Sequence, residues 1–233
     1  MPHPYWPLFD LVVRTPRLTL RYLDDALAVE LATLAAAGIH DPDTMPFAMP
    51  WTDVPSPELE QNAFRFYWRC RAETTPDSWQ LQFAVLEGAE TVGSTSLIAS
   101  AFGVVRTFET GSWLGRRFQG RGLGTEMRIA SLHLGFLGLG ALEATTGAFD
   151  DNMASLGVTR KLGYEPNGVA VHERRGARAQ SHRFRMTRQY FRDHVQRDDI
   201  EIEGDAAVRE LLGIPPTAAR PPVSDTLRVS DTS

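Results

Sequence analysis

The chain has 233 residues, enough for one well-buried domain, and its 42% hydrophobic and 23% charged residues are typical of an ordinary globular protein. Its net charge of −5 argues against a general binder of nucleic acids or membrane surfaces. A single cysteine excludes an intrachain disulfide, and no stretch approaches 18 consecutive apolar residues, so we expect a cytoplasmic protein.

Two regular elements are predicted in the first 40 residues. Apolar and polar side chains alternate over Leu18–Tyr22, which is the period of a half-buried strand, whereas the residues before them show no regular pattern. Asp24 or Asp25 can then cap a helix that has leucines along one face and ends at Gly38.

Residues 39–55 form a proline-containing stretch with no sustained period, yet they carry large apolar side chains. Such residues either plug the edge of a core or line a binding pocket, and the sequence leaves both readings open. We take Met45, Phe47 and Trp51 as candidate substrate-binding residues.

A helix and a β-hairpin are predicted next. Ser56 and Pro57 are typical of a helix start, and this helix should reach about Glu73. Cys70 lies at helical spacing with apolar residues of this helix, which indicates a small buried side chain. Alternation over residues 79–85, a turn at 87–90 and a return over 91–99 predict the hairpin, and a third antiparallel strand should span residues 106–115.

The stretch RRFQGRGLGTE, residues 116–126, lies between this third strand and a helical pattern that continues to Leu137. Glycines at 120, 122 and 124 let the backbone approach a ligand closely, and the first turn of a helix presents unpaired N–H groups at its positive end. That geometry suits a phosphate. Four arginines at 116, 117, 121 and 128 outweigh Glu126 here, although we expect Arg128 to be solvated.

Other phosphate-binding loops fit this stretch less well. A Walker loop needs a lysine followed by serine or threonine after its last glycine, and Thr125 and Glu126 stand there instead. A dinucleotide fingerprint needs an acid at the far end of the next strand, whereas Glu143 opens that strand.

The remaining elements alternate between strand and helix. We predict a strand over 142–149, a helix from Asn152 to about residue 162, and two short strands near 169–174 and 181–186. Thr187 should cap a closing helix that reaches about Val195. The predicted order of elements, βααβββαβαββ, indicates a mixed α/β sheet.

We expect two regions: a domain over residues 1–196, and a C-terminal extension over 197–233. The extension should form a short helix at about 205–213, and its four prolines among largely polar residues then predict a disordered tail.

Four motifs in this order resemble the GNAT superfamily of N-acyltransferases. The QxxGxG pattern of Gln119, Gly122 and Gly124 is similar to its acyl-CoA pyrophosphate loop. The other three are Arg14–Arg21, Glu109–Leu114, and Asp150–Ser155 followed by Arg160–Tyr164, and they resemble the branch that acetylates ribosomal-protein N-termini. The resemblance covers roughly residues 11 to 190. It implies a mixed, mostly antiparallel sheet with helices on both faces and a V-shaped splay between the fourth and fifth strands.

The resemblance also implies a donor, an acceptor and a binding site. The donor is an acyl-CoA, with acetyl-CoA leading and succinyl-CoA, used by similar actinobacterial proteins, as the alternative. The acceptor is a primary amine of a protein N-terminus, a lysine or a small molecule. A bulge expected at Trp113–Leu114 would offer a backbone N–H to the thioester oxygen. Expected cofactor-binding residues are Trp113, Leu114, Gln119, Gly120, Arg121, Gly122, Leu123, Gly124, Thr125, Asn152 and Arg160.

Acyl transfer to an amine needs a general base and a proton donor for the departing thiolate. Glu109 matches the glutamate of the resembling branch and is the candidate base, with an acid on a solvated strand face as the alternative. Ser155 matches a serine near the thiol and is the candidate acid, although it could only cap the helix or contact the cofactor. Tyr164 is assigned to packing.

The competing hypothesis is a non-catalytic module that binds CoA, which would lack a working base and acid. The six histidines are scattered without the spacing of a zinc site, so we predict no metal. We predict no nucleic-acid or membrane partner, and the oligomeric state is left open between a monomer and a homodimer.

Overall fold

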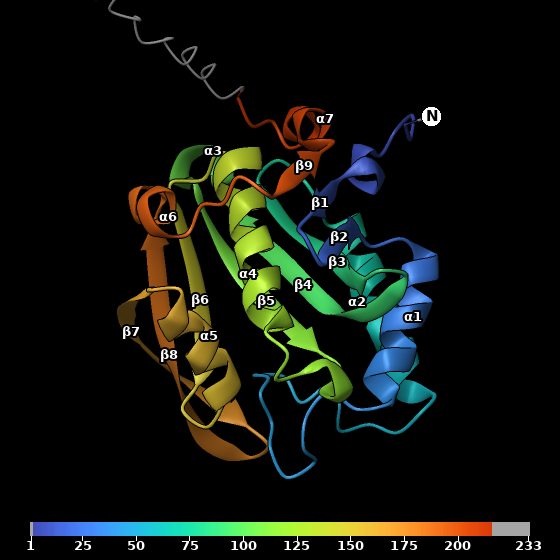
Figure 1. Ribbon diagram of the computed structural model, residues 1–233. Coiled ribbons are helices and arrows are strands. Elements are labelled where there is room, and N and C mark those ends of the chain that lie inside the picture. The colour runs from blue at the N-terminus through green and yellow to red at the C-terminus, as the bar shows by residue number, and fades with distance from the viewer. Residues whose placement is uncertain (1, 216–233) are drawn as a thin grey trace, which may run out of the picture.

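A computed structural model describes residues 2–215 of the chain. It contains a nine-stranded sheet in the order β7-β8-β6-β5-β4-β3-β2-β1-β9 (Figure 1). The β5–β6 pair is parallel and the other neighbouring strands run antiparallel. The strands are β1 (Val12–Arg14), β2 (Leu18–Tyr22), β3 (Ser78–Glu87), β4 (Glu90–Ser100), β5 (Thr107–Leu114), β6 (Glu143–Phe149), β7 (Glu165–Arg174), β8 (Ala177–Thr187) and β9 (Glu201–Glu203).

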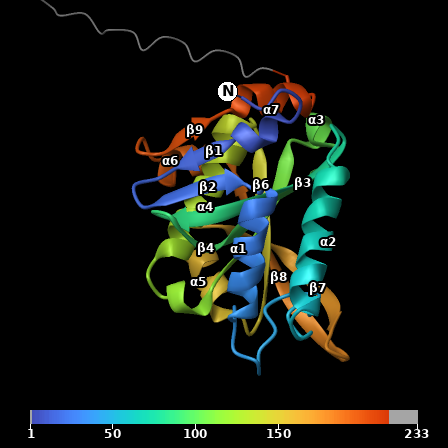
Figure 2. The same cartoon turned by 90° about the vertical axis from the view of Figure 1, so that its right-hand side faces the viewer.

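Helices cover both faces of this sheet, as predicted. Helices α1 and α2 lie on one face, and α4 and α5 lie on the other (Figures 1 and 2). The helical elements are η1 (Pro7–Asp10), α1 (Asp25–Ala36), α2 (Glu58–Ala72), α3 (Phe102–Val105), η2 (Arg116–Phe118), α4 (Leu123–His133), η3 (Leu134–Gly138), α5 (Met153–Lys161), α6 (Arg188–His194) and α7 (Asp205–Leu211).

Strand β3 shows how one sequence pattern builds both layers. Successive side chains of a strand point to opposite faces. Phe83 and Val85 enter the main core, which lies between the sheet and α4, while Ala84 and Leu86 pack against the leucines of α1 and Tyr67 of α2. The sheet is therefore buried on both faces at its centre.

Three of the predicted helix starts are confirmed by capping contacts, whereas α2 starts after Pro57 without a side-chain cap. The Asp24 carboxylate accepts from the Leu27 N–H at 2.8 Å, so Asp24 is the cap of α1. The Asn152 side chain accepts from the Ser155 N–H at 3.1 Å, and the Thr187 hydroxyl accepts from the Tyr190 N–H at 3.2 Å. Each cap satisfies an otherwise unpaired N–H of a first helical turn.

Short strands and the ends of longer ones were missed from the sequence. Strand β1 lies in the stretch expected to be irregular, and at three residues it is too short to show a period. Strands β7 and β8 have ten and eleven residues and extend beyond the two short strands predicted, because a register shift between Pro166 and Val169 interrupts the alternation. Helix α3 lies between the two strands predicted over residues 91–99 and 106–115, where no regular element was expected.

The segment after α6 joins the same sheet. Strand β9 pairs with β1, with Val13 opposite Ile202, and α7 follows it and packs near η1 and η3. The division expected at residue 196 places β9 and α7 in the C-terminal extension. The expected disordered tail falls on residues 216–233, which lie outside the described residues.

The predicted splay is present between β5 and β6, which are the fourth and fifth of the strands predicted from the sequence because β1 was not predicted. The two strands pair only from Thr107 opposite Glu143 to Glu109 opposite Thr145, although β5 continues to Leu114 and β6 to Phe149. Their outer edges stay paired with β4 and β8. Beyond Glu109 the two strands therefore form the arms of a V.

The bulge expected at Trp113–Leu114 is not seen in the described pairing of β4 with β5. That register runs without a shift from Ile98 opposite Glu109 to Gly93 opposite Leu114. The V therefore opens without a bulge in β5, and each arm keeps its outer partner strand. Among residues 2–215, no helix is both long and apolar enough to span a bilayer.

Candidate active site

A glycine loop closes the open end of the V. Gly120 and Gly122 have φ angles of +74° and +79°, a left-handed conformation that L side chains rarely adopt. Within the described residues, the backbone N–H groups of residues 120–125 donate no hydrogen bond. Helix α4 starts at Leu123, so these N–H groups lie at its positive end. The loop is built to hold an anion such as a phosphate.

Side chains hold this loop in place from outside. The Gln119 side-chain amide donates to the carbonyls of Ile39 at 2.7 Å and Leu114 at 2.9 Å. Glu126 accepts from the Thr15 hydroxyl at 2.6 Å and forms an ion pair with Arg17 at 2.7 Å. Burial alone would raise the pKa of Glu126, but the hydrogen bonds from Thr15 and Arg17 bring it below its ordinary value, so the carboxylate stays charged.

Ion pairs partly neutralise the arginines that the sequence places around the glycine loop. Arg121 pairs with Glu87 at 2.7 Å, and Arg117 pairs with Glu90 at 2.6 Å, so both are bound to the β3–β4 hairpin. Arg116 forms no ion pair in the described part of the chain. The unpaired N–H groups are thus the main attraction for an anion.

Arg128 is buried, with 4% of its surface exposed, which corrects the expectation that it is solvated. Its guanidinium bridges the V, donating to the Thr146 hydroxyl of β6 at 2.9 Å and to the Ser112 hydroxyl of β5 at 3.3 Å. The buried Tyr164 hydroxyl lies beside it, within reach of Arg128 and Thr110. Burial raises the pKa of Tyr164 despite the neighbouring charge of Arg128, so this hydroxyl is neutral.

The sequence did not identify Arg128 or Tyr164 as parts of the site. A signal was present for Arg128, because Gly124, Arg128 and Gly135 share one face of the helix at spacings of four and seven. Gly135 allows close approach to the strands, because an added Cβ would lie 2.1 Å from Phe108, whereas at Gly124 it would meet Leu114 at an ordinary contact distance of 3.7 Å. A charged residue between these two glycines must face the sheet.

Glu109 lies on the opposite face of the sheet from Arg128, since it alternates with Ser112 along β5. Its exposed side chain lines a cavity of about 270 Å³ at the base of the V. The His172 ring shares a hydrogen bond of 2.9 Å with the Ser181 hydroxyl in this cavity, and Arg183 lines it without an ion pair in the described chain. The cavity thus combines a carboxylate, an imidazole and a guanidinium.

Helix α5 brings the second predicted segment beside the loop. Its Val158 side chain would lie 3.8 Å from a Cβ at Gly124, so the first turn of α4 faces α5. The Asn152 oxygen is engaged as the helix cap, while Ser155 is half-buried and Arg160 is exposed. The glycine loop and α5 therefore flank the same side of the V.

The apolar loop of residues 39–55 packs at the edge of the core, which is one of the two roles considered from the sequence. Met45 is buried, whereas Phe47 and Trp51 are partly buried. The Phe47 ring lies tilted against Trp51 and Trp51 against Trp113 of β5, with ring centroids 5.4 and 6.1 Å apart. The loop reaches across to the β7–β8 hairpin (Figure 1), where Arg174 donates to the Met45 carbonyl at 2.7 Å. Arg175 forms an ion pair with Asp53.

In residues 2–215, no group of three or more histidine, cysteine or acidic side chains could hold a metal ion.

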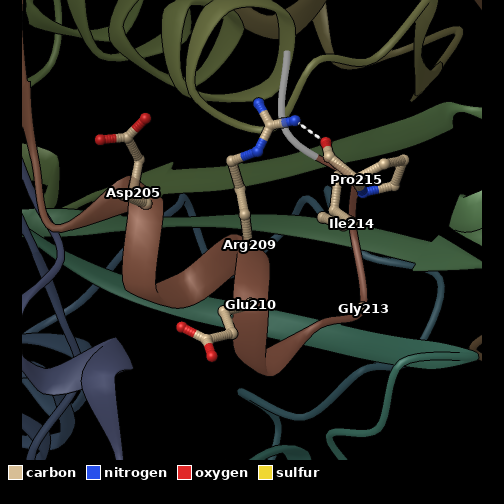
Figure 3. A pocket seen from close by; sticks show the side chains of 7 residues that line it. Asp205, Arg209, Glu210, Gly213, Ile214 and Pro215 are labelled. Atoms are coloured by element: carbon tan, nitrogen blue, oxygen red, sulfur yellow. Dashed lines mark hydrogen bonds between the residues drawn. The ribbon is translucent and has the colours of Figure 1, made fainter.

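A second cavity, of about 580 Å³, lies against α7 between Asp205 and Pro215, apart from the V (Figure 3). It contains none of the predicted site residues, and Arg209 there donates to the Pro215 carbonyl.

Comparison with known proteins gives a family match and similar solved structures. The model of the acetyltransferase (GNAT) domain family matches residues 17–165, which is more than half of the chain. RimJ from Mycobacterium smegmatis, solved in complex with CoA-disulfide, is 18% identical with a TM-score of 0.62, over 82% of this chain and 96% of that one.

Two other structures give similar values. A GNAT-family acetyltransferase from Bacillus anthracis is 16% identical with a TM-score of 0.61, covering 76% of this chain and 99% of that one. A GCN5-related N-acetyltransferase from Brucella melitensis is 17% identical with a TM-score of 0.60, covering 78% and 80%. At these identities the likeness concerns the fold.

Proposed function

Because this chain belongs to the acetyltransferase (GNAT) family, whose reaction is acyl transfer from CoA to an amine, we propose that its donor is acetyl-CoA. The observation that carries the proposal is the row of unpaired N–H groups at residues 120–125, located where the V opens. The pyrophosphate binds these groups. The pantetheine arm then runs between β5 and β6 towards the base of the V.

The amine attacks from the other face of the sheet, where the 270 Å³ cavity holds Glu109. Glu109 takes the proton from the ammonium, directly or through water, and the neutral amine attacks the thioester carbonyl. Backbone N–H groups on the unpaired arm of β5 stabilise the oxyanion, and Ser155 returns a proton to the departing thiolate. Asn152 and Arg160 contact the donor from α5, and the apolar loop with Phe47 and Trp51 borders the acceptor.

For the acceptor we propose the α-amine of a protein N-terminus. An α-amine has a pKa near 7.7 to 8.0 and is appreciably neutral at pH 7, whereas lysine, near 10.4, is neutral in about one molecule in 2,500. An exposed carboxylate such as Glu109 can deprotonate an α-ammonium group far more easily than a lysine ammonium group.

The donor and the acceptor are tested on the whole chain. Calorimetry with acetyl-CoA, succinyl-CoA and CoA measures donor binding, and mass spectrometry follows transfer to a peptide with a free N-terminus, an N-acetylated peptide with lysine, and a small amine. We expect binding of acetyl-CoA and transfer to the free N-terminus. Binding without transfer to any amine would indicate a non-catalytic module, and faster transfer from succinyl-CoA would change the donor.

The first prediction separates the base from the acid. Glu109→Gln keeps the shape of the side chain but cannot accept a proton, so kcat/KM should fall about 10² to 10⁴-fold at neutral pH and partly recover at high pH, where the amine is neutral unaided. Ser155→Ala should lower kcat with less dependence on pH. Near-normal rates of both variants from about pH 6 to 9 would show that water carries the protons.

A further inference from the structure

We propose that Arg128 stabilises the negative charge on the sulfur of CoA when the thioester bond breaks. This inference rests on the proposed binding of an acyl-CoA in the V. It adds to the reaction a side chain from the α4 face of the sheet, opposite to Glu109.

The position of Arg128 places it at the reacting end of the arm. Its Nη1 donates to Thr146, the residue that follows Thr145, where β6 last pairs with β5. Its Nη2 donates to Ser112 on the other arm of the V. A pantetheine arm that starts at the glycine loop follows β5 from Leu114 past Ser112 towards Glu109. The distance from Leu114 to Glu109 along the strand is about 17 Å at 3.4 Å per residue. The thioester end of the arm therefore comes to the base of the V, beside the guanidinium.

The described residues give Arg128 no partner of negative charge. The side chain is 4% exposed, it forms no ion pair with a described residue, and both of its described acceptors are neutral hydroxyls. Its Nε is buried without a hydrogen-bond partner among the described residues, and the neutral Tyr164 hydroxyl is its other close neighbour. Burying a cation without a counter-charge is costly, so such a group indicates a ligand that supplies negative charge.

The reaction produces that charge at the sulfur. The amine nitrogen bonds to the thioester carbon, its proton passes to Glu109 and then to solvent, and the C–S bond breaks. The electron pair of that bond stays on sulfur, which departs as a thiolate until it is protonated. A neighbouring guanidinium lowers the pKa of a thiol. Arg128 therefore makes CoA a better leaving group before any proton reaches it.

The thiol pKa of bound CoA tests this directly, through its ultraviolet thiolate absorbance as a function of pH. With the wild-type protein we expect the bound thiol to titrate at least one pH unit below free CoA. Arg128→Met should abolish this difference, and Arg128→Lys, which keeps the charge, should retain most of it. In transfer assays Arg128→Met should lower kcat about 100-fold for acetyl-CoA and succinyl-CoA alike.

Thr146→Val and Ser112→Ala are the matched controls, because each removes one acceptor of Arg128 but leaves its charge. They should change the thiol pKa little. If either control raises the thiol pKa of bound CoA as much as Arg128→Met does, the arginine only bridges the strands and the proposal is wrong. A loss confined to succinyl-CoA would assign Arg128 to an acyl carboxylate instead, and would also overturn it.

The proposed function fails separately from this inference. If the wild-type chain does not bind CoA at all, the proposed function is wrong and the inference with it. If CoA binds but its thiol titrates as in solution, only the inference is overturned. Thermal unfolding checks that the variants fold. If Arg128→Met does not fold, Arg128→Lys still tests whether the charge lowers the thiol pKa.

Discussion

Single residues determine the donor side of this site. Gly122 takes a φ of +79° that a residue with a side chain adopts only under strain, and this turns the chain into the first helical residue, Leu123. Gln119 was expected to contact the cofactor, and its side chain is hydrogen-bonded to the carbonyls of Ile39 and Leu114 instead of pointing freely into solvent. These two bonds hold in place the loop whose N–H groups bind the pyrophosphate in the proposed function.

Gly122→Val should weaken acyl-CoA binding at least tenfold, about 1.4 kcal/mol. The branched side chain strains the left-handed backbone and stands among the unpaired N–H groups, with its Cβ only 3.6 Å from Arg17 Nη2. Gly168→Val is the control, because Gly168 has a φ of +97° in open space on the edge strand β7. Calorimetry that shows equal affinity in both variants would remove the loop from the binding site.

At the scale of elements, the β7–β8 hairpin fastens the apolar loop to the sheet. Arg174 joins three segments: it donates to the Met45 carbonyl, pairs with Asp151 at 2.6 Å and lies 4.2 Å above the Phe149 ring. The hydrogen bonds from Arg174 hold the pKa of Asp151 below its usual range, as those from Arg175 do for Asp53. This clamp holds the apolar loop, with Phe47 and Trp51, against the β7–β8 hairpin, whose His172, Ser181 and Arg183 line the 270 Å³ cavity.

Arg175→Ala should therefore raise the KM of the amine several-fold and leave the affinity for acyl-CoA unchanged. Exposed ion pairs contribute little to stability, about 0 to 1 kcal/mol, so the unfolding temperature should change little. Arg178→Ala, on the same hairpin but without an ion pair in the described chain, is the control. An unchanged KM in steady-state assays would leave the loop with a packing role only.

At the scale of the whole molecule, the segment after α6 ties the far end of α4 to the sheet edge. The Arg197 N–H donates to Nε2 of His133, which is fully buried at the end of α4, and the chain then continues into β9 beside β1. Burial, reinforced by Arg197, lowers the pKa of His133 to about 4. This histidine stays neutral in the folded protein at every physiological pH.

The pKa of His133 predicts a pH dependence of stability. In the unfolded chain the histidine takes up a proton below about pH 6.5, whereas the folded protein resists protonation until about pH 4. Its contribution is therefore fully present above pH 6.5 and is lost as the pH falls towards 4. The free energy of unfolding should drop by about 2 to 3 kcal/mol over this window from this group.

Denaturant unfolding at several pH values measures this drop, and His133→Gln is the variant to compare. The substitution destabilises the protein at all pH values, but its free energy of unfolding should depend less on pH between 4 and 6.5. A slope equal to that of the wild type would show that other groups cause the acid sensitivity.

The sequence by itself determined the longer elements and the glycine turn before α4, because both depend on local chemistry. Alternation over β3 and β4, the caps Asp24, Asn152 and Thr187, and the glycines of the loop act within a few residues of one another. Such features carry their conformational preference in the sequence, so the mixed α/β order and the glycine turn were predictable.

Only the tertiary structure decided what lies inside the V. Its opening depends on where β5 and β6 stop pairing, and these strands are separated in sequence by the whole of α4. Arg128 looks like a surface residue by type, yet the close approach of α4 to β5 and β6 buries it between Ser112 and Thr146. The strand β9 likewise shows no pattern of its own, because three residues become a strand only when β1 supplies the hydrogen bonds.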